Sequence, residues 1–339
     1  MAMLDVRDLK TRFKTSDGVV KAVDGVSFSL EPGQTLGIAG ESGSGKSAAA
    51  LSIMQLNPQP PCWYPGGEIL FEGRNLIGAS EKQMRQVRGN EIAMIFQDPM
   101  MSLNPVFTIG NQIMETIRIH QHVTKAEARQ RTLEVLRDVG IPHPEERVKE
   151  YPHQFSGGMR QRAMIAMALS CNPKVLIADE PTTALDVTIQ AQILELITKL
   201  QDRYETAVII ITHDLGVMAK VADDVLVMYA GRVVEKGTVD DIFYETMMPY
   251  SWSLLRSLPR LDMPEGVRLL PIPGTPPSLI SLPEGCNFHP RCPFVKQECH
   301  QVDPPLEEKR PKHQAACILS VDELEAQKRS LAEELEVEG

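Results

Sequence analysis

Apolar and polar residues alternate in the first part of the chain, as they do in strands with one buried face. Val23 to Leu30 follows this alternation, and Glu31-Pro32-Gly33 supplies the residue types of a turn. Thr35 to Ala39 is apolar after its first residue, which predicts a buried strand that runs into a glycine-rich loop. We therefore expect residues 1 to about 98 to form mainly short strands and turns.

The spacing becomes helical from about Thr108 to Ala168, where apolar residues recur every three or four positions with charges between them. From Val175 to Gly231 apolar strands again alternate with helices, such as the one expected over Ile189 to Leu200. This alternation predicts a mainly parallel sheet covered on both faces. The helical stretch would form a second lobe inserted into that sheet.

The chain changes character after Phe243. Residues 249–317 hold 13 of the 25 prolines and four of the six cysteines, which predicts an irregular extension. The final stretch, DELEAQKRSLAEELE, is expected to be a solvated acidic helix.

The composition narrows the class of protein. With 339 residues, 42% hydrophobic and 24% charged, the chain is long enough for a large core, which excludes a disulfide-stapled miniprotein and wholesale disorder. The net charge of −10 disfavours nucleic acid as a partner. The longest apolar runs fall short of the about 20 residues that cross a bilayer, and the first residues do not resemble a secretion signal. We expect a protein of the reducing cytosol, with its cysteines as thiols or metal ligands.

A phosphate-binding pattern, G-x4-G-K-S, follows the strand that ends at Ala39 and precedes a helix expected over Ala48 to Leu56. Its glycines would let backbone N–H groups face phosphate oxygens at a helix N-terminus. Lys46 would reach the β and γ phosphates, and the Ser47 hydroxyl would bind Mg²⁺. The alternative is a chance glycine-rich turn. The residues assigned to the nucleotide here are Gly40, Ser42, Gly43, Ser44, Gly45, Lys46 and Ser47.

The segment Val175 to Glu180 supplies a second part of a phosphoryl-transfer site. Four apolar residues predict a buried strand whose carboxyl end presents Asp179 to the metal, with Glu180 one step closer to the γ-phosphate. Glu180 would then be the general base for an attacking water. Without the phosphate loop, an apolar strand that ends in two acidic residues would not by itself indicate a nucleotide site.

The turn Ser156-Gly157-Gly158 precedes a helix expected over Arg162 to Ser170. It would either cap that helix or offer donors to a second phosphate group. One nucleotide does not need two phosphate-binding loops from the same chain. We therefore expect this turn to close over the nucleotide of another subunit.

In this order the motifs resemble those of the ATP-binding subunit of an ABC transporter, and the resemblance covers about residues 1 to 245. It implies an α/β fold: a P-loop NTPase (RecA-like) core with an antiparallel β subdomain and a helical subdomain inserted at about 99–170. It also implies that Gln97 senses the γ-phosphate, binds Mg²⁺ and contacts the membrane partner. His213 would be the switch histidine.

The same resemblance implies roles at the dimer interface and the base. Ser156, Gly157 and Gly158 match the signature that acts in trans, and the loop Ala184 to Asp186 matches the one that crosses the interface. Phe13 falls where the family usually places a tyrosine that stacks on adenine. The signature departs from LSGGQ at two positions, which are Phe155 and Met159.

Four cysteines lie in the proline-dense extension, with five, six and seventeen residues between them. A segment with few apolar periodic runs could be stapled by a bound metal, and four thiolates suit either a [4Fe–4S] cluster or structural zinc. The alternative is that the thiols are buried and bind no metal. The sequence has no C-x2-C pair, which argues against a zinc ribbon. The four candidates are Cys286, Cys292, Cys299 and Cys317, whereas Cys62 and Cys171 have no partner at ligand spacing.

The run PIPGTPP and the cysteine spacing resemble the C-terminal region of the oligopeptide and dipeptide subfamily, and IFQDPMMSLNP and EYPHQFSGGMRQR also resemble it. The resemblance implies an iron–sulfur cluster in residues 246–339 and a peptide importer driven by ATP hydrolysis. The expected partners are a second ATPase subunit that is a different paralogue, two transmembrane permease subunits and an extracytoplasmic peptide-binding protein. The chain would be peripheral at the cytoplasmic face of the inner membrane.

Other functions stay open at this point. Importers of nickel or opine cargo are close relatives of this subfamily. A soluble ABC-type ATPase acting on DNA or ribosomes is a different class, but the gap from Ser47 to Ser156 has room only for a compact helical lobe, and the chain has one cassette. A regulatory protein with a dead site conflicts with the presence of every catalytic residue type.

Overall fold

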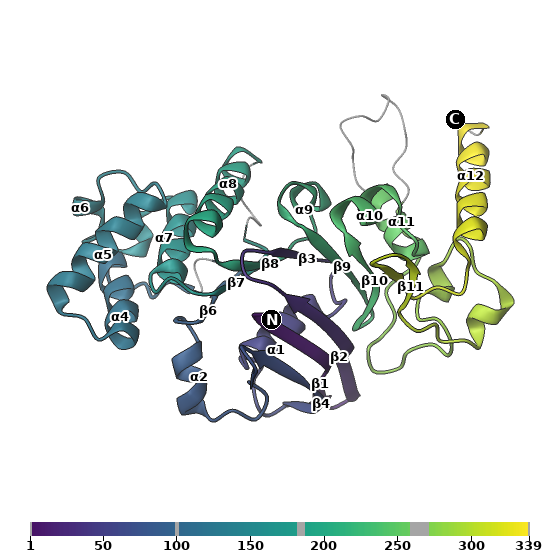
Figure 1. Ribbon diagram of the computed structural model, residues 1–339, viewed down its shortest axis with the longest axis horizontal. Helices are drawn as coiled ribbons and strands as arrows, with labels where there is room; N and C mark the ends of the chain where they lie inside the picture. Colours follow the sequence, from purple (N-terminus) through teal and green to yellow (C-terminus); the bar gives the residue numbers. More distant parts are fainter. Residues whose placement is uncertain (1, 99–101, 182–186, 258–270, 338–339) are drawn as a thin grey trace.

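The computed structural model describes residues 2–98, 102–181, 187–257 and 271–337. A mixed central sheet runs through the middle of the molecule, with an antiparallel sheet beneath it (Figure 1). A helical lobe lies at one end and the C-terminal extension at the other (Figure 1). Within the described residues, no helix combines the length and apolarity that a membrane crossing needs.

The antiparallel sheet has the strand order β2-β1-β4-β5. Its strands are β1 (Leu4–Thr15), β2 (Gly18–Leu30), β4 (Cys62–Phe71) and β5 (Arg74–Asn75). Val26, Phe28 and Leu30 are buried while the residues between them are exposed, so the predicted half-buried strand is confirmed. The buried face packs against helix α1 (Lys46–Ile53), through Ala49 and Ile53.

The central sheet has the order β11-β12-β10-β9-β3-β8-β7-β6. Five neighbouring strands are parallel, as the alternation of strands and helices predicted: β9 (Asp224–Tyr229), β3 (Thr35–Ala39), β8 (Ala207–Ile211), β7 (Val175–Asp179) and β6 (Ile92–Ile95). Both faces of β7 are buried, because Val175 and Ile177 pack with α1 whereas Leu176 and Ala178 pack with α8 (Val187–Tyr204). This arrangement confirms the predicted P-loop-type α/β core. Helix α9 (Leu215–Val221) follows β8 and contacts β3.

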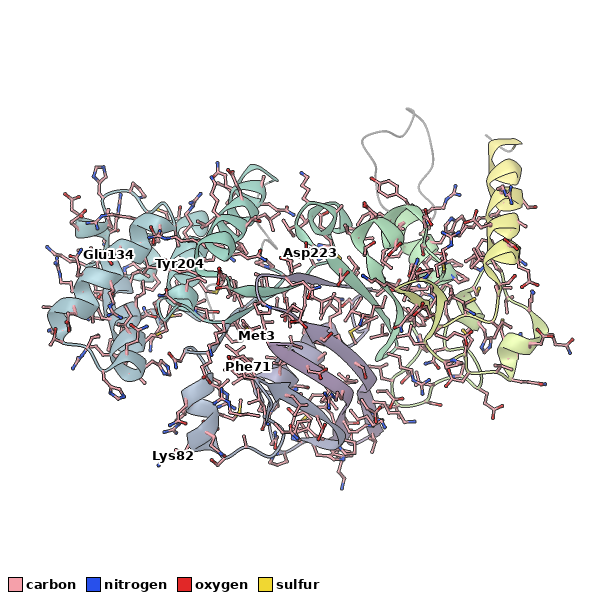
Figure 2. The ribbon with its side chains drawn as sticks, viewed as in Figure 1. Met3, Phe71, Lys82, Glu134, Tyr204 and Asp223 are labelled. Atoms are coloured by element: carbon pink, nitrogen blue, oxygen red, sulfur yellow. The ribbon has the colours of Figure 1, made fainter. Side chains whose placement is uncertain are left out.

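The helical lobe consists of α4 (Ile109–Gln121), α5 (Lys125–Asp138), α6 (Pro144–Arg147), the short helix η1 (Pro152–Gln154) and α7 (Gly157–Leu169). Ile109, Ile113 and Ile117 are buried along one face of α4, as their spacing predicts. The lobe shares one hydrophobic core with β7, β8 and α8. Tyr204, labelled in Figure 2, lies at the end of α8. It donates a 3.2 Å hydrogen bond to Asp138 of α5. The lobe is therefore fastened to the sheet by packing.

One helix was not predicted in the first part of the chain. It is α2 (Glu81–Val87), which a Ser80 capping box starts. The Ser80 hydroxyl accepts a hydrogen bond from the Gln83 backbone N–H, and Gln83 reaches back to the Ser80 backbone. The S-x-x-Q pattern was available in the sequence as a signal for this helix.

The extension is less separate from the cassette than its composition indicates. Its elements after β10 (Arg232–Thr238) are α10 (Val239–Tyr244), α11 (Pro249–Arg256), η2 (His289–Arg291), η3 (Gln297–His300), β11 (Glu307–Arg310), β12 (His313–Ala315) and α12 (Val321–Val337). Strand β12 pairs antiparallel with β10, with Lys236 opposite Gln314. The extension therefore adds two strands to the central sheet, and the predicted wholly irregular appendage is wrong in that respect.

The last helix is also more than a solvated helix. Leu324 of α12 is buried in the core of the extension, and Leu331 packs against that core. The half-buried Lys328 ammonium donates to the Thr246 carbonyl oxygen. Helix α12 is therefore docked on one face, which corrects the expectation of a fully solvated helix.

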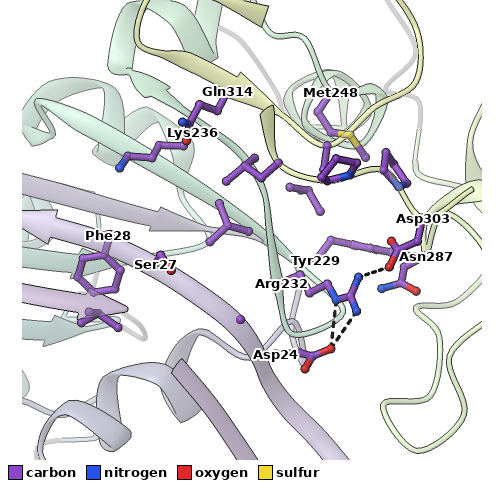
Figure 3. A pocket seen from close by; sticks show the side chains of 18 of the residues that line it. Asp24, Ser27, Phe28, Tyr229, Arg232, Lys236, Met248, Asn287, Asp303 and Gln314 are labelled. Atoms are coloured by element: carbon purple, nitrogen blue, oxygen red, sulfur yellow. Dashed lines mark hydrogen bonds and ion pairs between the residues drawn. The ribbon is translucent and has the colours of Figure 1, made fainter. Parts of the chain in front are cut away.

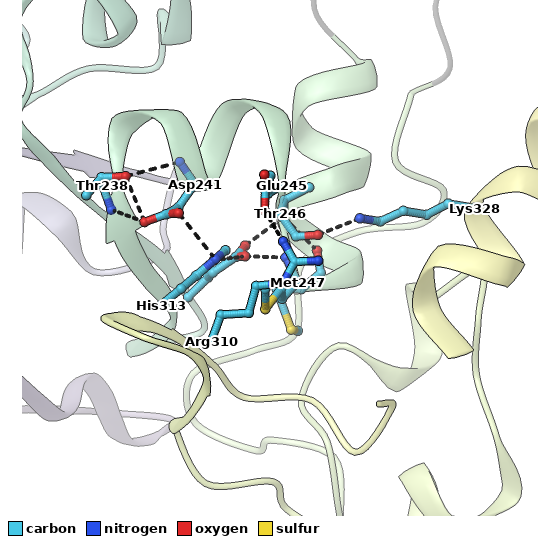
Figure 4. Close-up of polar contacts among 10 residues, drawn as sticks. Thr238, Asp241, Glu245, Thr246, Met247, Arg310, His313 and Lys328 are labelled. Atoms are coloured by element: carbon cyan, nitrogen blue, oxygen red, sulfur yellow. Dashed lines mark hydrogen bonds and ion pairs between the residues drawn. The ribbon is translucent and has the colours of Figure 1, made fainter. Parts of the chain in front are cut away.

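A buried polar cluster fastens the extension to β10 (Figure 4). Glu235 and His313 are almost fully buried, and His313 Nε2 lies 2.8 Å from Glu235 Oε1. The Thr246 hydroxyl donates to Glu235 Oε2 at 2.8 Å, and the Met247 backbone N–H donates to Oε1. A buried carboxylate is stable only when its oxygens are satisfied in this way.

A cavity of about 680 Å³ lies between the antiparallel sheet, β10 and the extension (Figure 3). Arg232 bridges its walls by pairing with Asp24 of β2 at 3.0 Å and with Asp303 of the extension at 2.5 Å. Together with Arg12, which lies 2.5 Å from Asp24, this network ties the two sheets and the extension together.

Candidate nucleotide site

The phosphate loop lies between β3 and α1. Gly40, Gly43 and Gly45 all have positive φ, which other residues rarely adopt. A Cβ on Gly40 would lie 2.3 Å from the Met228 carbonyl oxygen, and one on Gly45 would lie 2.3 Å from that of Ala22. The glycines are therefore required both by the backbone path and by the close approach of neighbouring strands.

Two polar groups of the loop are consistent with a phosphate ligand. The Ser44 hydroxyl is buried and has no hydrogen-bond partner among the described residues. The Lys46 ammonium, also buried, donates to the carbonyl oxygens of Gly40 at 2.8 Å and Glu41 at 2.9 Å. Burial lowers the pKa of Lys46, while the carboxylates of Glu180, Asp179 and Glu41 act in the opposite direction.

Ser47 and Asp179 come together at the ends of α1 and β7. The Ser47 hydroxyl donates to Asp179 Oδ1 at 3.2 Å. Burial raises the pKa of Asp179, and the neighbouring Glu180 carboxylate adds to this rise. A hydroxyl and a carboxylate oxygen are donor types that Mg²⁺ accepts, so this pair fits a magnesium ion.

Glu180 follows β7 with a φ of +48°, an uncommon conformation for this residue type. Its backbone N–H donates to the Ile211 carbonyl oxygen at 2.8 Å. Gln97 Nε2 donates to Glu180 Oε2 at 2.8 Å, and His213 Nδ1 lies 3.5 Å from Oε1. The three residues assigned to catalysis therefore meet at the carboxyl edge of the sheet.

The serine-glycine turn lies on the helical lobe, away from the loop that starts α1 (Figure 1). Ser156 caps α7, because its hydroxyl accepts a 3.3 Å hydrogen bond from the Met159 backbone N–H. Gly157 is exposed, and a Cβ built on it would meet nothing within 4 Å. Capping is thus observed, and the open side of the turn leaves space for another molecule.

The other assigned residues have different outcomes. Phe13 lies half-buried on β1, opposite Val20 and Cys62. Asp186 and the loop that begins at Ala184 lie outside the described residues. The roles of Phe13 and Asp186 therefore stay predictions.

The extension brings its cysteines to one place. A cavity enclosed mainly by apolar side chains is lined by Cys286, Cys292, Cys299 and Cys317. All six cysteines of the chain are free thiols. Burial raises the pKa of Cys292 to about 12 and that of Cys317 to about 11, with the other cysteines adding to the rise. Across the described residues, no three His, Cys, Asp or Glu side chains are close enough to hold a single metal ion.

Three residues at the phosphate loop were not singled out in the sequence. Glu41 forms an ion pair with Arg291 of the extension, and its backbone N–H donates to the Tyr250 hydroxyl at 2.8 Å. No local pattern links residues separated by more than 200 positions, so this contact could not be predicted from the sequence.

Two family models match the chain. The model described as ABC transporter matches residues 23–183, and the one described as oligopeptide/dipeptide transporter, C-terminal region, matches residues 234–299. The second model includes three of the four clustered cysteines.

Curated relatives are similar over nearly the whole length. The chain is 56% identical over 304 residues to the oligopeptide transport ATP-binding protein OppD of Bacillus subtilis, covering 90% of this chain and 85% of that protein. It is 53% identical over 317 residues to the dipeptide transport ATP-binding protein DppD of the same organism, covering 94% of each.

A solved structure supports the fold. A bacterial ABC transporter cassette, described as dimeric, matches with a TM-score of 0.63 and 26% identity over 70% of this chain and 99% of that one. The chain belongs to the family of ABC transporter ATP-binding proteins.

Proposed function

We propose that the chain is the ATP-hydrolysing subunit of an ABC importer for peptides. The observation that carries the proposal is the convergence of Lys46, Ser47 and Asp179 on one side of the site with Gln97, Glu180 and His213 on the other. The relatives named for oligopeptide and dipeptide transport support the peptide cargo.

In this proposal Lys46 exchanges its loop carbonyl partners for the β and γ phosphates of ATP. Mg²⁺, when bound, neutralises phosphate charge and would be held by Ser47 Oγ, Asp179 and the Gln97 amide. Glu180 accepts a proton from the attacking water, and Gln97 and His213 orient its carboxylate.

A second subunit would complete the site. The backbone donors of Ser156, Gly157 and Gly158, at the N-terminus of α7, would face the γ-phosphate held by the partner. The exposure of this turn supports the assignment, as does the dimeric description of the matching cassette. Phe13 would contact the adenine, and Asp186 would cross the interface.

The four clustered cysteines would hold a [4Fe–4S] cluster. The donor set fits, since four thiols line one cavity and a four-iron cluster takes four thiolates spread around its volume. Structural zinc, which also takes four thiolates, is the alternative for the same residues.

Transport would require two membrane permease subunits and an extracytoplasmic peptide-binding protein, with this chain peripheral on the cytoplasmic face of the inner membrane. The test is co-expression with the neighbouring permeases and a second ATPase, followed by uptake of a labelled peptide into proteoliposomes. ATP-dependent uptake is the expected result. Uptake of nickel or of an opine in its place, or purification with nucleic acid and no permease, would contradict the peptide assignment.

A further inference from the structure

The phosphate loop is held by the extension through Glu41, the residue after the first glycine of the loop. Arg291 forms a two-pronged ion pair with Glu41, at 2.6 Å to Oε2 and 2.9 Å to Oε1. The Arg291 side chain is only 4% exposed, whereas that of Glu41 is 24% exposed. Such paired, partly buried bonds are among the stronger polar contacts in proteins.

A second contact reaches the backbone of the same residue. The Tyr250 hydroxyl accepts a 2.8 Å hydrogen bond from the Glu41 N–H. The Tyr250 ring is fully buried against Tyr229 and Phe288, with centroid distances of 4.5 and 5.3 Å. Both the side chain and the backbone of Glu41 are therefore fixed by groups from outside the ATP-binding motifs.

The extension residues that make these contacts are themselves held firmly. Arg291 Nε donates to the Pro273 carbonyl oxygen at 2.9 Å, and its guanidinium lies 5.8 Å from the centre of the Tyr229 ring. Further along, the Lys21 N–H of β2 donates to the Leu279 carbonyl oxygen at 2.9 Å. The extension is thus anchored both at Arg291 and on β2.

The charge of Glu41 makes this arrangement consequential for nucleotide binding. The Lys46 ammonium donates to the Glu41 carbonyl oxygen, so the Glu41 carboxylate is near the place where a triphosphate would bind. An unpaired carboxylate there would repel phosphate and compete for Lys46. Arg291 neutralises that carboxylate through the two-pronged ion pair.

We propose that Arg291 and Tyr250 are positioning residues for ATP binding, through which the cysteine-containing extension fixes and neutralises the phosphate loop at Glu41. This inference rests on the proposed nucleotide site. It makes the extension a requirement for tight nucleotide binding. An attachment that only stabilises the fold would not have this effect.

The test is a charge-rescue cycle on the full chain. Binding of a non-hydrolysable ATP analogue with Mg²⁺ is measured by calorimetry for the parent, R291M, E41Q and the double variant. R291M is expected to raise the Kd about tenfold, as loss of a charged hydrogen bond would. Because the double variant has no unpaired carboxylate, it is expected to bind at least about fivefold tighter than R291M.

The matched control is R232M, which removes another arginine that ties the cassette to the extension, through Asp24 and Asp303. It is expected to lower the melting temperature but to keep the parent Kd. If R291M does not fold, Y250F tests the same proposal. It leaves the Glu41 N–H without its acceptor, and it should raise the Kd for the analogue about threefold.

Two outcomes would overturn the proposal. The first is a Kd for the analogue in R291M or Y250F that equals the Kd of the parent. The second is a double variant that binds the analogue no more tightly than R291M. Failure of the parent to bind the analogue would instead contradict the nucleotide site itself. The two failures are therefore distinguishable.

Discussion

The Gln97 amide donates a 2.8 Å hydrogen bond to the Glu180 carboxylate, from a residue 83 positions earlier in the chain. Gln97 follows β6 and Glu180 follows β7, and these strands are parallel neighbours in the central sheet. The hydrogen bond orients a carboxylate without neutralising it. This arrangement supports the proposed role of Glu180 as a general base.

Replacing Glu180 by Gln tests its role as base. The variant keeps the size of the side chain but cannot accept a proton, so ATP hydrolysis is expected to fall by about 10²-fold or more. Binding of Mg-ATP should persist, because Lys46 and the loop are unchanged. Steady-state hydrolysis and calorimetry check the two expectations.

The control is E195Q on the exposed face of α8, where Glu195 pairs only with Lys199 of the same helix among the contacts that the structure describes. It should hydrolyse ATP at the parent rate. Unchanged turnover in E180Q would remove the proposed role of Glu180.

Gly157→Asp tests the contribution of the serine-glycine turn to a partner site. A carboxylate at the start of α7 suits the helix dipole, and the space beside Gly157 is open, so the subunit should fold. The same carboxylate would repel a γ-phosphate held by the partner. In an E180Q background, ATP-dependent dimerisation should be lost when followed by light scattering.

The matched control is Ala126→Asp, which adds the same charge to the first turn of α5 at an exposed position. Dimerisation of this variant should equal that of E180Q. If the G157D variant of E180Q formed dimers at the same ATP concentration as E180Q itself, the turn would not face a nucleotide.

Cys292→Ser tests the cluster. Loss of one of four thiolates is expected to reduce the iron content and the visible absorbance of protein purified without air, since each iron corner needs its ligand. Cys171→Ser is the control, because Cys171 is buried beside α4, with its thiol 3.8 Å from the Thr116 carbonyl oxygen. A colourless parent that contains zinc and no iron would refute the cluster.

Glu235→Ala tests how the extension is attached. The change leaves His313, the Thr246 hydroxyl and the Met247 N–H without a shared acceptor in a buried place, so we expect a loss of about 3 kcal/mol of unfolding free energy. Chemical denaturation measures this loss. E195A, at an exposed pair, should change stability by less than about 0.5 kcal/mol. Equal stability of the two variants would mean that the buried contacts of Glu235 do not hold the extension.

Much of the nucleotide site could be predicted because its signals are local. The glycines of Gly40–Ser47 are dictated by backbone angles, and the apolar run before Asp179 is dictated by burial on both faces of a strand. Asp179 and Glu180 were expected at the carboxyl end of their strand, and parallel strands present these ends at one edge of the sheet. The structure brings these residues to that edge.

The attachment of the extension could not be predicted in this way. Pairing of β12 with β10, burial of Glu235 against His313 and the ion pair between Glu41 and Arg291 each join distant segments. Such contacts depend on the shape of the whole chain, because neither partner has a local pattern that specifies the other. The sequence by itself determined the chemistry at the phosphate loop, and only the tertiary structure decided that an arginine from the cysteine segment holds that loop in place.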